Sequence, residues 1–469
     1  MKQITSSSLW SGWTMTFKLI GIFFLTLLLL IPRFMLTDLV SEREALNNSV
    51  CDEVSSSWAK DQLITGPYLI IPYWEYAFDS ILRQKKNYYK LIIMPEELKI
   101  EGSFTTNEKN RSLYKVMLYE TKLNFSGNFK IPDLKELNIL IQQINWNDAF
   151  ISCSISDPKG ISTESYITID SSKIRMNPGM LGMDIQSRLE PSESPISNAQ
   201  RRIFNYQGPS MNGLSAHYPI LNPENPIEFS LPIDLKGSRS LLFSPVAQNT
   251  SVTIRSAFAS PSFIGEFLPQ HDLSDKGFTA NWKILDYNKS IPHYYNKTNT
   301  VDLGNNLFGM NIQNPVNHYS KTDRACKYLI LFIIITFLAV FLTEIIHKIK
   351  VHIFQYSLVG LALTIFFALL LSISEFLTFN LSYAISAIAI TIMIYIYSLS
   401  IFQKINSSYL LSFLIISFFS FMFIIIQLEK VALLFGTIML FIMLGLTMFI
   451  TRKINWYEQN NDAEDRIVY

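Results

Sequence analysis

The chain has 469 residues, of which 49% are hydrophobic and only 16% are charged. Soluble globular proteins carry roughly 25% charged residues, so this composition indicates a membrane protein. The 39 basic and 38 acidic residues leave a net charge of +1, which argues against a nucleic-acid-binding protein. The hydrophobic content and the presence of only 3 cysteines argue against a disordered chain and a disulfide-dense toxin.

An apolar stretch near the N-terminus, residues 17–36, reads FKLIGIFFLTLLLLIPRFML. About 20 residues are enough for a helix to cross the ~30 Å hydrocarbon core of a bilayer. The stretch is long for a signal peptide, and no small-residue cleavage pattern follows it. We therefore expect an uncleaved signal anchor after a cytoplasmic tail of residues 1–16, with a cleaved signal peptide as the alternative.

Further apolar stretches follow one another closely from residue 327 onward. Each is long enough to span a bilayer, and the short polar joints between them require antiparallel neighbours. We predict a transmembrane bundle of five helices over residues 327–451 and a cytoplasmic tail over residues 452–469. The five stretches cover residues 328–346, 353–373, 376–401, 409–427 and 431–450.

The basic residues of the short loops predict the orientation, because Lys and Arg concentrate on the cytoplasmic side. On the other side, the short joints hold only Glu375 and the pair Glu429 and Lys430. We therefore expect six spans, both termini in the cytoplasm and residues 37–326 in the periplasm. The basic residues on the cytoplasmic side are Lys2, Lys348, Lys350, Lys404, Arg452 and Lys453.

Residues 37–326 have the pattern of a β-rich domain. Within residues 227–236, IEFSLPIDLK, every second residue is apolar, as in a strand with one buried face. Similar segments and regular turn residues predict a sandwich-like α+β domain. We also expect a helix leaving the membrane over residues 41–63 and a short helix over residues 132–144, where Leu and Ile recur every three or four residues. The similar segments cover residues 111–129, 251–258 and 278–285.

Patterns of catalytic or metal-binding residues are not found. The six histidines form no zinc motif, and the sequence has no C-x-x-C, P-loop or dinucleotide fingerprint. Residues 213–217, GLSAH, lack the closing glycine of a nucleophile elbow. Cys51 and Cys153 could pair, but the odd number of cysteines leaves at least one free thiol. We predict no catalytic residue, no cofactor, no metal and no enzyme activity.

A transporter would be expected to hold polar groups or broken helices deep in the membrane. Here Glu344 lies near the end of its predicted span, and no span is interrupted in its middle. Gly360, Gly436 and Gly445 are typical of close helix packing. A membrane transporter or a lipid-handling carrier, with the bundle as its active part, is therefore the alternative function.

Several segments, taken in chain order, resemble the CreD family of Gram-negative inner-membrane proteins, which is associated with cell envelope integrity. The resemblance implies one N-terminal span, a large periplasmic domain and a C-terminal bundle. It also implies a link to envelope stress and to a two-component regulatory system, but no reaction. Phe376 departs from the pattern, since the family often has His there. The matching segments are GPYLIIPY (66–73), GFTANW (277–282), PVNHYSKTDR (315–324), QYSLVGLA (355–362), LLSISE (370–375), LLFGT (433–437) and TRKINWY (451–457).

Candidate interaction residues stand just outside the second predicted span, at headgroup level. Aromatic and long basic side chains favour that depth, where they anchor a helix or contact lipid phosphate. Glu375, in a tight external joint, either pairs with Lys430 or faces water. We predict a lipid or partner site here, with plain interfacial anchoring as the alternative. The site consists of Asn317, Tyr319, Lys321, Arg324 and Glu375.

The leading hypothesis is that this inner-membrane protein supports envelope integrity by binding an envelope protein or lipid through its periplasmic domain. Its expected partners are the lipid bilayer and that envelope ligand, with no nucleic acid. The sequence leaves the oligomeric state open.

Overall fold

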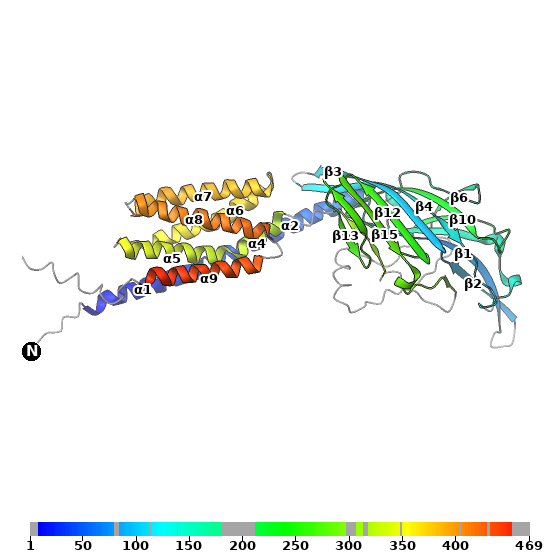
Figure 1. Cartoon of the computed structure of the whole chain (residues 1–469), viewed down its shortest axis with the longest axis horizontal. Coiled ribbons are helices and arrows are strands. Elements are labelled where there is room, and N and C mark those ends of the chain that lie inside the picture. Colours follow the sequence, from blue (N-terminus) through cyan, green and yellow to red (C-terminus); the bar gives the residue numbers. More distant parts are fainter. Residues whose placement is uncertain are drawn as a thin grey trace, which may run out of the picture. The chain divides into compact units, whose positions relative to one another are not determined.

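A computed structural model describes most of the chain, and it separates into two compact units (Figure 1). The helical unit comprises Met1–Asn47 and Val316–Tyr469, and the β unit comprises Asn48–Pro315. The described residues are 8–78, 84–111, 114–137, 139–179, 212–296, 306–312, 318–347, 349–402, 405–428 and 432–452.

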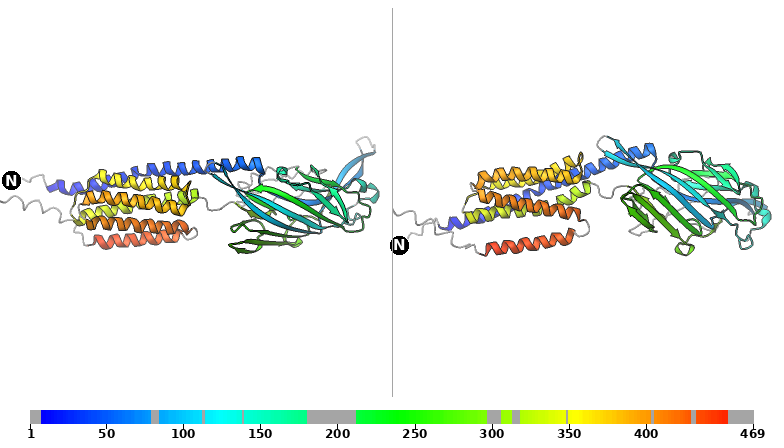
Figure 2. Two further views of the ribbon diagram at one scale, coloured as in Figure 1. Left: turned by 90° about the horizontal axis from the view of Figure 1, so that it is seen from above. Right: turned by 45° about the horizontal axis from the view of Figure 1, so that its top comes forward.

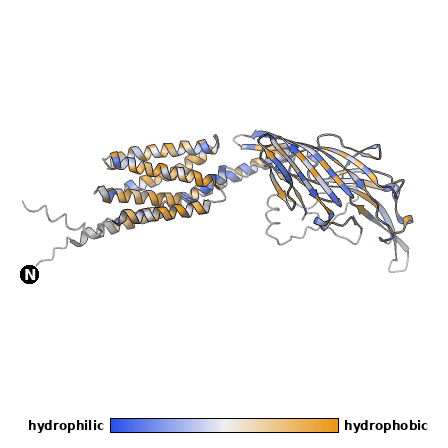
Figure 3. Cartoon of the chain, in the orientation of Figure 1, coloured by the Kyte–Doolittle hydropathy of each residue, from blue (hydrophilic) through white to orange (hydrophobic). Residues whose placement is uncertain are grey.

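The helical unit is a bundle of apolar helices that run side by side (Figures 1 and 2). Hydrophobic residues predominate in α5 to α9, as expected for helices in a membrane, whereas α2 is largely hydrophilic (Figure 3). α2 also extends into the β unit. The helices are α1 (Ser8–Leu28), α2 (Leu30–Trp58), α4 (His318–Lys327), α5 (Leu329–His347), α6 (Ile353–Ser374), α7 (Phe379–Phe402), α8 (Ile405–Gln427) and α9 (Ala432–Thr451).

The predicted membrane helices are confirmed as helices, and the predicted number of six spans stays a prediction. By length and composition, four described helices can cross a membrane: Phe17–Trp58, α6, α7 and α8. A fifth span is possible if α4 and α5, which are bent by 43° relative to each other, count as one. The sixth predicted span corresponds to α9, whose apolar part, Leu434–Phe449, is shorter than the four helices that can cross a membrane.

Aromatic rings from four helices form the centre of the bundle. Phe332 of α5 stacks on Phe418 of α8 with ring centroids 4.2 Å apart, and Phe366 of α6 lies 4.6 Å from Phe419. Tyr383 of α7 donates a hydrogen bond to the Phe419 carbonyl at 2.8 Å. Between helices in lipid, packing and hydrogen bonds replace the hydrophobic effect as the attraction. These aromatic contacts therefore hold α5, α6, α7 and α8 together.

One of the three glycines expected at helix contacts allows a close approach. A Cβ atom at Gly360 would lie 2.4 Å from the Leu29 side chain and 2.8 Å from Phe337. The absence of a side chain at Gly360 thus lets α6 pack closely against Leu29, between α1 and α2, and against α5. By contrast, no atom in the described part of the chain lies within 4 Å of a Cβ built at Gly436 or Gly445.

We predict that Gly360→Leu destabilises the purified protein, because the added side chain overlaps Leu29 and Phe337. Overpacking typically costs about 1–3 kcal/mol. The thermal unfolding midpoint in detergent, followed by circular dichroism, should fall by several degrees. Gly436→Leu is the matched control and should change the midpoint little. Equal losses for both variants would contradict the assigned packing role of Gly360.

The strands of the β unit form two sheets within the described residues. The first has the order β13-β17-β11-β1-β5-β9-β8, with β2 on β1 and β16 on β2. The second has the order β14-β15-β12-β3-β4-β10-β6-β7. The strands are β1 (Gln62–Phe78), β2 (Gln84–Ile93), β3 (Glu97–Arg111), β4 (Tyr114–Phe129), β5 (Phe150–Ile155), β6 (Tyr166–Ile169), β7 (Ser172–Arg175), β8 (Asn177–Pro178), β9 (Gly213–His217), β10 (Ile227–Ser238), β11 (Ser240–Phe243), β12 (Asn249–Ser256), β13 (Ser262–Gly265), β14 (Gln270–Ser274), β15 (Gly277–Ile284), β16 (Tyr294–Tyr295) and β17 (Phe308–Asn311).

The alternating pattern predicted for residues 227–236 is confirmed, since burial alternates along β10. The apolar residues of both sheets contribute to one core, which includes Trp282 at 2% exposure. Most strand pairs are antiparallel, but β1 pairs with β11, and β3 with β12, in parallel. The sandwich is therefore mixed rather than purely antiparallel.

The helix predicted over residues 132–144 is wrong. Its described part contains a turn and the short 3₁₀ helix η1 (Ile141–Gln143), and a second one, η2 (Trp146–Asp148), follows. Within this segment the backbone bonds to itself only over short turns, as from the Gln143 amide to the Leu140 carbonyl at 2.8 Å, and its end bonds to β1. Ile144 forms a bridge with Tyr73, and the Asn145 amide donates to the Pro72 carbonyl at 2.9 Å. Contact with the sheet therefore overrides the helical periodicity. The helix expected over residues 41–63 is confirmed as part of α2, which ends at Trp58.

Candidate functional site

The residues predicted to form one interaction site have different surroundings. Tyr319 is 1% exposed and packs with Val40 of α2 and Leu371 of α6. Its ring thus lies inside the helical unit, where it stabilises packing and is not accessible to a ligand. Asn317 lies outside the described residues.

Lys321 of α4 connects three helices. Its ammonium group donates a hydrogen bond to Gln427 of α8 at 3.4 Å and lies 5.3 Å from the ring centre of Phe379 in α7. The Gln427 amide in turn donates to Asn380 of α7 at 2.7 Å. Arg324, one turn further along α4, donates to the Ser320 carbonyl at 3.3 Å. Lys321 therefore helps to position α4 on the bundle.

Glu375 has a partner that the sequence did not suggest. Its carboxylate lies 3.7 Å from the Arg43 guanidinium of α2, and its side chain is 11% exposed. Lys430, which we considered as a partner, lies outside the described residues. The contact with Arg43 joins the end of α6 to the first membrane helix.

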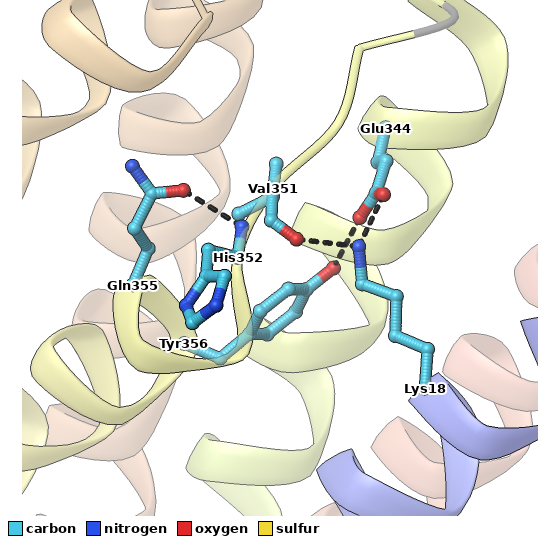
Figure 4. A network of polar contacts seen from close by, with 6 residues as sticks. All are labelled: Lys18, Glu344, Val351, His352, Gln355 and Tyr356. Carbon is cyan, nitrogen blue, oxygen red and sulfur yellow. Dashed lines mark hydrogen bonds and ion pairs between the residues drawn. The ribbon is translucent and has the colours of Figure 1, made fainter. Parts of the chain in front are cut away.

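A second polar network, missed from the sequence, lies near the opposite end of α6 (Figure 4). Lys18 of α1 forms an ion pair with Glu344 of α5 and donates to the Val351 carbonyl between α5 and α6. The Tyr356 hydroxyl of α6 donates to the other Glu344 oxygen at 3.0 Å. Lys18 and Glu344 are only 19% and 13% exposed. A buried charge is costly unless it is paired and hydrogen-bonded, and both charges meet that condition here.

The same network includes the start of α6. The His352 Nδ1 atom accepts a hydrogen bond from the Phe354 amide at 3.2 Å, and the Gln355 side chain accepts one from the His352 amide at 2.9 Å. These bonds cap the helix and fix the chain next to Val351. A sequence signal existed, because Lys18 and Glu344 are opposite charges placed on the same predicted side of the membrane.

We predict that removing one charge of the pair is more harmful than removing both. Lys18→Met or Glu344→Gln leaves a buried charge alone, at a cost of about 3–5 kcal/mol. The double variant should lose clearly less than the sum of the two single variants. Unfolding of helical structure during titration with sodium dodecyl sulfate measures these losses. Lys327→Met is the control, because Lys327 pairs with Asp323 at an exposed position. Strict additivity of the two single changes would refute the coupling.

The β unit contains a charge cluster where α2 ends and β1 begins. Asp52 of α2 forms an ion pair with Arg239, which lies between β10 and β11. Burial raises the pKa of Asp61 to about 6, although Arg239 and Ser240 beside it favour the ionised form and oppose this effect. The Tyr119 hydroxyl donates to the Ser240 carbonyl at 2.7 Å. This cluster attaches the last turns of α2 to both sheets.

We predict that Asp61 makes the stability of the β unit depend on pH. A carboxyl with a raised pKa in the folded state stabilises it at low pH, and this contribution is lost as pH rises through about 6. Between pH 5 and pH 8 the loss amounts to about 1 kcal/mol. Asp61→Asn should remove this part of the pH dependence, as measured by hydrogen exchange of the β1 amides. An unchanged pH profile in that variant would show that Asp61 is not responsible.

Cysteine, histidine and acidic side chains are the groups that could form a metal or redox centre. Cys51, Cys153 and Cys326 are buried and do not form a disulfide bond. Among the described residues, no group of three or more His, Cys, Asp and Glu could hold a metal ion.

An exposed ribbon of two strands extends beyond the first sheet (Figure 1). β5 pairs with β1 only up to Ile70, and β16 pairs with β2 only at Ile92 and Ile93. Residues 74–78 of β1 and 84–88 of β2 pair with each other. No other described strand pairs with either of these two segments. We call this segment the aromatic ribbon.

One face of the aromatic ribbon carries aromatic rings and a lysine. Trp74 is opposite Tyr88, and Tyr76 is opposite Lys86, so these four side chains share a face. Tyr88 is 76% exposed and Tyr76 is 48% exposed. The opposite face turns toward the protein at Tyr73, which is 1% exposed. Large exposed aromatic rings outside the core are typical of binding surfaces.

These features define a multi-pass membrane protein in which a helical bundle is joined to a large β-rich domain. The chain matches the family "Inner membrane protein CreD" over residues 14–457 and belongs to it. It is 27% identical over 451 residues to Inner membrane protein CreD of Escherichia coli (strain K12), a match that covers 94% of this chain and 93% of that protein. The resemblance seen in the sequence is thus confirmed.

Proposed function

We propose that the protein supports cell envelope integrity without catalysis, by binding an envelope protein or lipid through its β unit. In this proposal the β unit faces the periplasm and both termini face the cytoplasm. The distribution of Lys and Arg between the short loops supports this orientation.

The aromatic ribbon is the observation that carries the proposal. Most apolar residues of the two sheets are buried in one core, whereas Trp74, Tyr76 and Tyr88 form an aromatic face outside the two-sheet body. A ribbon of two strands gains little stability in water on its own. The segment before Ile144, which forms a bridge with Tyr73 of β1, adds apolar surface. In it, the side chains of Leu140 and Ile141 are 64% and 67% exposed.

We predict that a photoreactive phenylalanine analogue at position 88 or 76 captures an envelope component in intact cells. Both positions already carry an exposed aromatic ring, so the change preserves the local structure. The same analogue at Tyr287 is the control, because Tyr287 is 95% exposed and belongs to η4 (Asp286–Asn288), which is not part of the ribbon. Mass spectrometry of the adducts identifies the partner.

The rival function is a transporter or lipid-handling carrier whose bundle is the active part. The bend of 43° between α4 and α5 favours it, since carriers use interrupted helices. A crosslinker at Lys321 in the bundle extends the same experiment. Discrete adducts at positions 88 and 76, absent at position 287, support binding by the β unit. Lipid adducts confined to position 321 would instead favour the carrier.

A further inference from the structure

We infer that the aromatic ribbon binds an acidic saccharide, either the sugar headgroup of an anionic glycolipid or a free acidic glycan. This inference rests on the proposed function and specifies the chemistry of the bound component. It is argued from the shape of the ribbon face, its ring geometry and its charge.

The shape of the ribbon favours a flat and extended ligand. A ribbon one strand layer thick cannot enclose a side chain as a concave pocket does. It offers ring faces and edges instead, spaced by the strand repeat of about 7 Å between alternate residues. Sugar rings suit such a surface, because one side of each ring presents C–H groups and its hydroxyl groups can stay in water.

The ring geometry leaves aromatic surface available to such a ligand. The Trp74 and Tyr76 rings are 4.9 Å apart and nearly perpendicular, at 76°. Tyr88, opposite Trp74 on the same face, is 76% exposed. The electron-rich face of an aromatic ring attracts the weakly positive hydrogen atoms of C–H groups. Tyr88 is therefore the ring best placed for stacking.

The charge of the segment favours an acidic ligand. The Lys86 ammonium group lies 4.1 Å from the ring centre of Trp74 and 6.0 Å from that of Tyr76. It is therefore next to any ligand on these rings, where it can pair with a carboxylate or a phosphate. In the described residues 74–78 and 84–90, basic residues outnumber acidic ones. The basic residues are Lys85, Lys86 and Lys90, and the acidic residue is Glu75.

Two other partners are compatible with parts of this surface but fit it less well. An acidic protein would match the charge, but protein partners usually anchor a side chain in a recess, which a single strand layer does not form. A phospholipid surface would attract Trp, Tyr and Lys without any saccharide. Both partners are outcomes of the test.

The experiment uses the full-length protein in detergent and three soluble polymers. Polygalacturonate supplies acidic sugar rings, dextran supplies neutral sugar rings and polyphosphate supplies charge alone. We expect binding to polygalacturonate, weaker binding to dextran and little binding to polyphosphate, as measured by biolayer interferometry. Tyr88→Ala should weaken polygalacturonate binding roughly three- to tenfold, and Tyr287→Ala should not. Lys86→Gln should reduce binding of polygalacturonate but not of dextran.

Vesicles distinguish the two sources of the saccharide. Retention of the protein by vesicles that contain an anionic glycolipid, but not by phosphatidylglycerol vesicles, indicates a lipid headgroup. Binding to polygalacturonate with no vesicle retention indicates a free glycan. Equal retention by both kinds of vesicle, or polyphosphate binding that Tyr88→Ala does not change, would overturn the inference. Because Tyr88 is largely exposed, an unchanged circular dichroism melt can confirm that the variant is folded.

The proposed function and this inference can fail separately. Crosslinks from position 88 to a protein, together with no binding of any saccharide, would overturn the inference and leave the proposed function standing. No adduct at positions 76 and 88, together with no saccharide binding, would reject both.

Discussion

The helical unit depends on the pairing of the charges that its N-terminal helices bring into the bundle. Lys18 pairs with Glu344 and Arg43 pairs with Glu375, so α1 and α2 are attached near both ends of α6. An unpaired charge in this environment would be expensive, which makes these partners obligatory. Gly360 permits the close packing between the two attachments, and the aromatic contacts of α5 to α8 complete the bundle.

In the β unit, the two sheets share one core, and the aromatic ribbon extends beyond it. The two sheets bury alternate residues of their strands, and the charge cluster around Arg239 attaches α2 to them. β1 has 17 residues, and β5 covers only its first part, so the end of β1 and its partner β2 continue as the aromatic ribbon. The long strand thus links the core to the surface on which both proposals rest.

Local patterns made most of the secondary structure predictable. The apolar stretches became helices, and the alternation in β10 became a strand with one buried face. The helix expected over residues 132–144 did not form, because the end of this segment bonds to β1, which a local period cannot reveal. The surroundings of the candidate interaction residues could not be predicted from local patterns. Tyr319 has the residue type of an interfacial anchor, but Val40 and Leu371 bury it.

By itself, the sequence determined the membrane-spanning character, the β-rich domain and the family, because these follow from composition, periodicity and ordered motifs along the chain. Only the tertiary structure decided which charges form pairs, which rings are buried and where β1 continues beyond the strand that pairs with it. Lys18 and Glu344 are 326 positions apart, and the partners of Glu375 and β1 are also distant in sequence. Contacts over such separations depend on how whole helices and sheets pack, which no local pattern encodes.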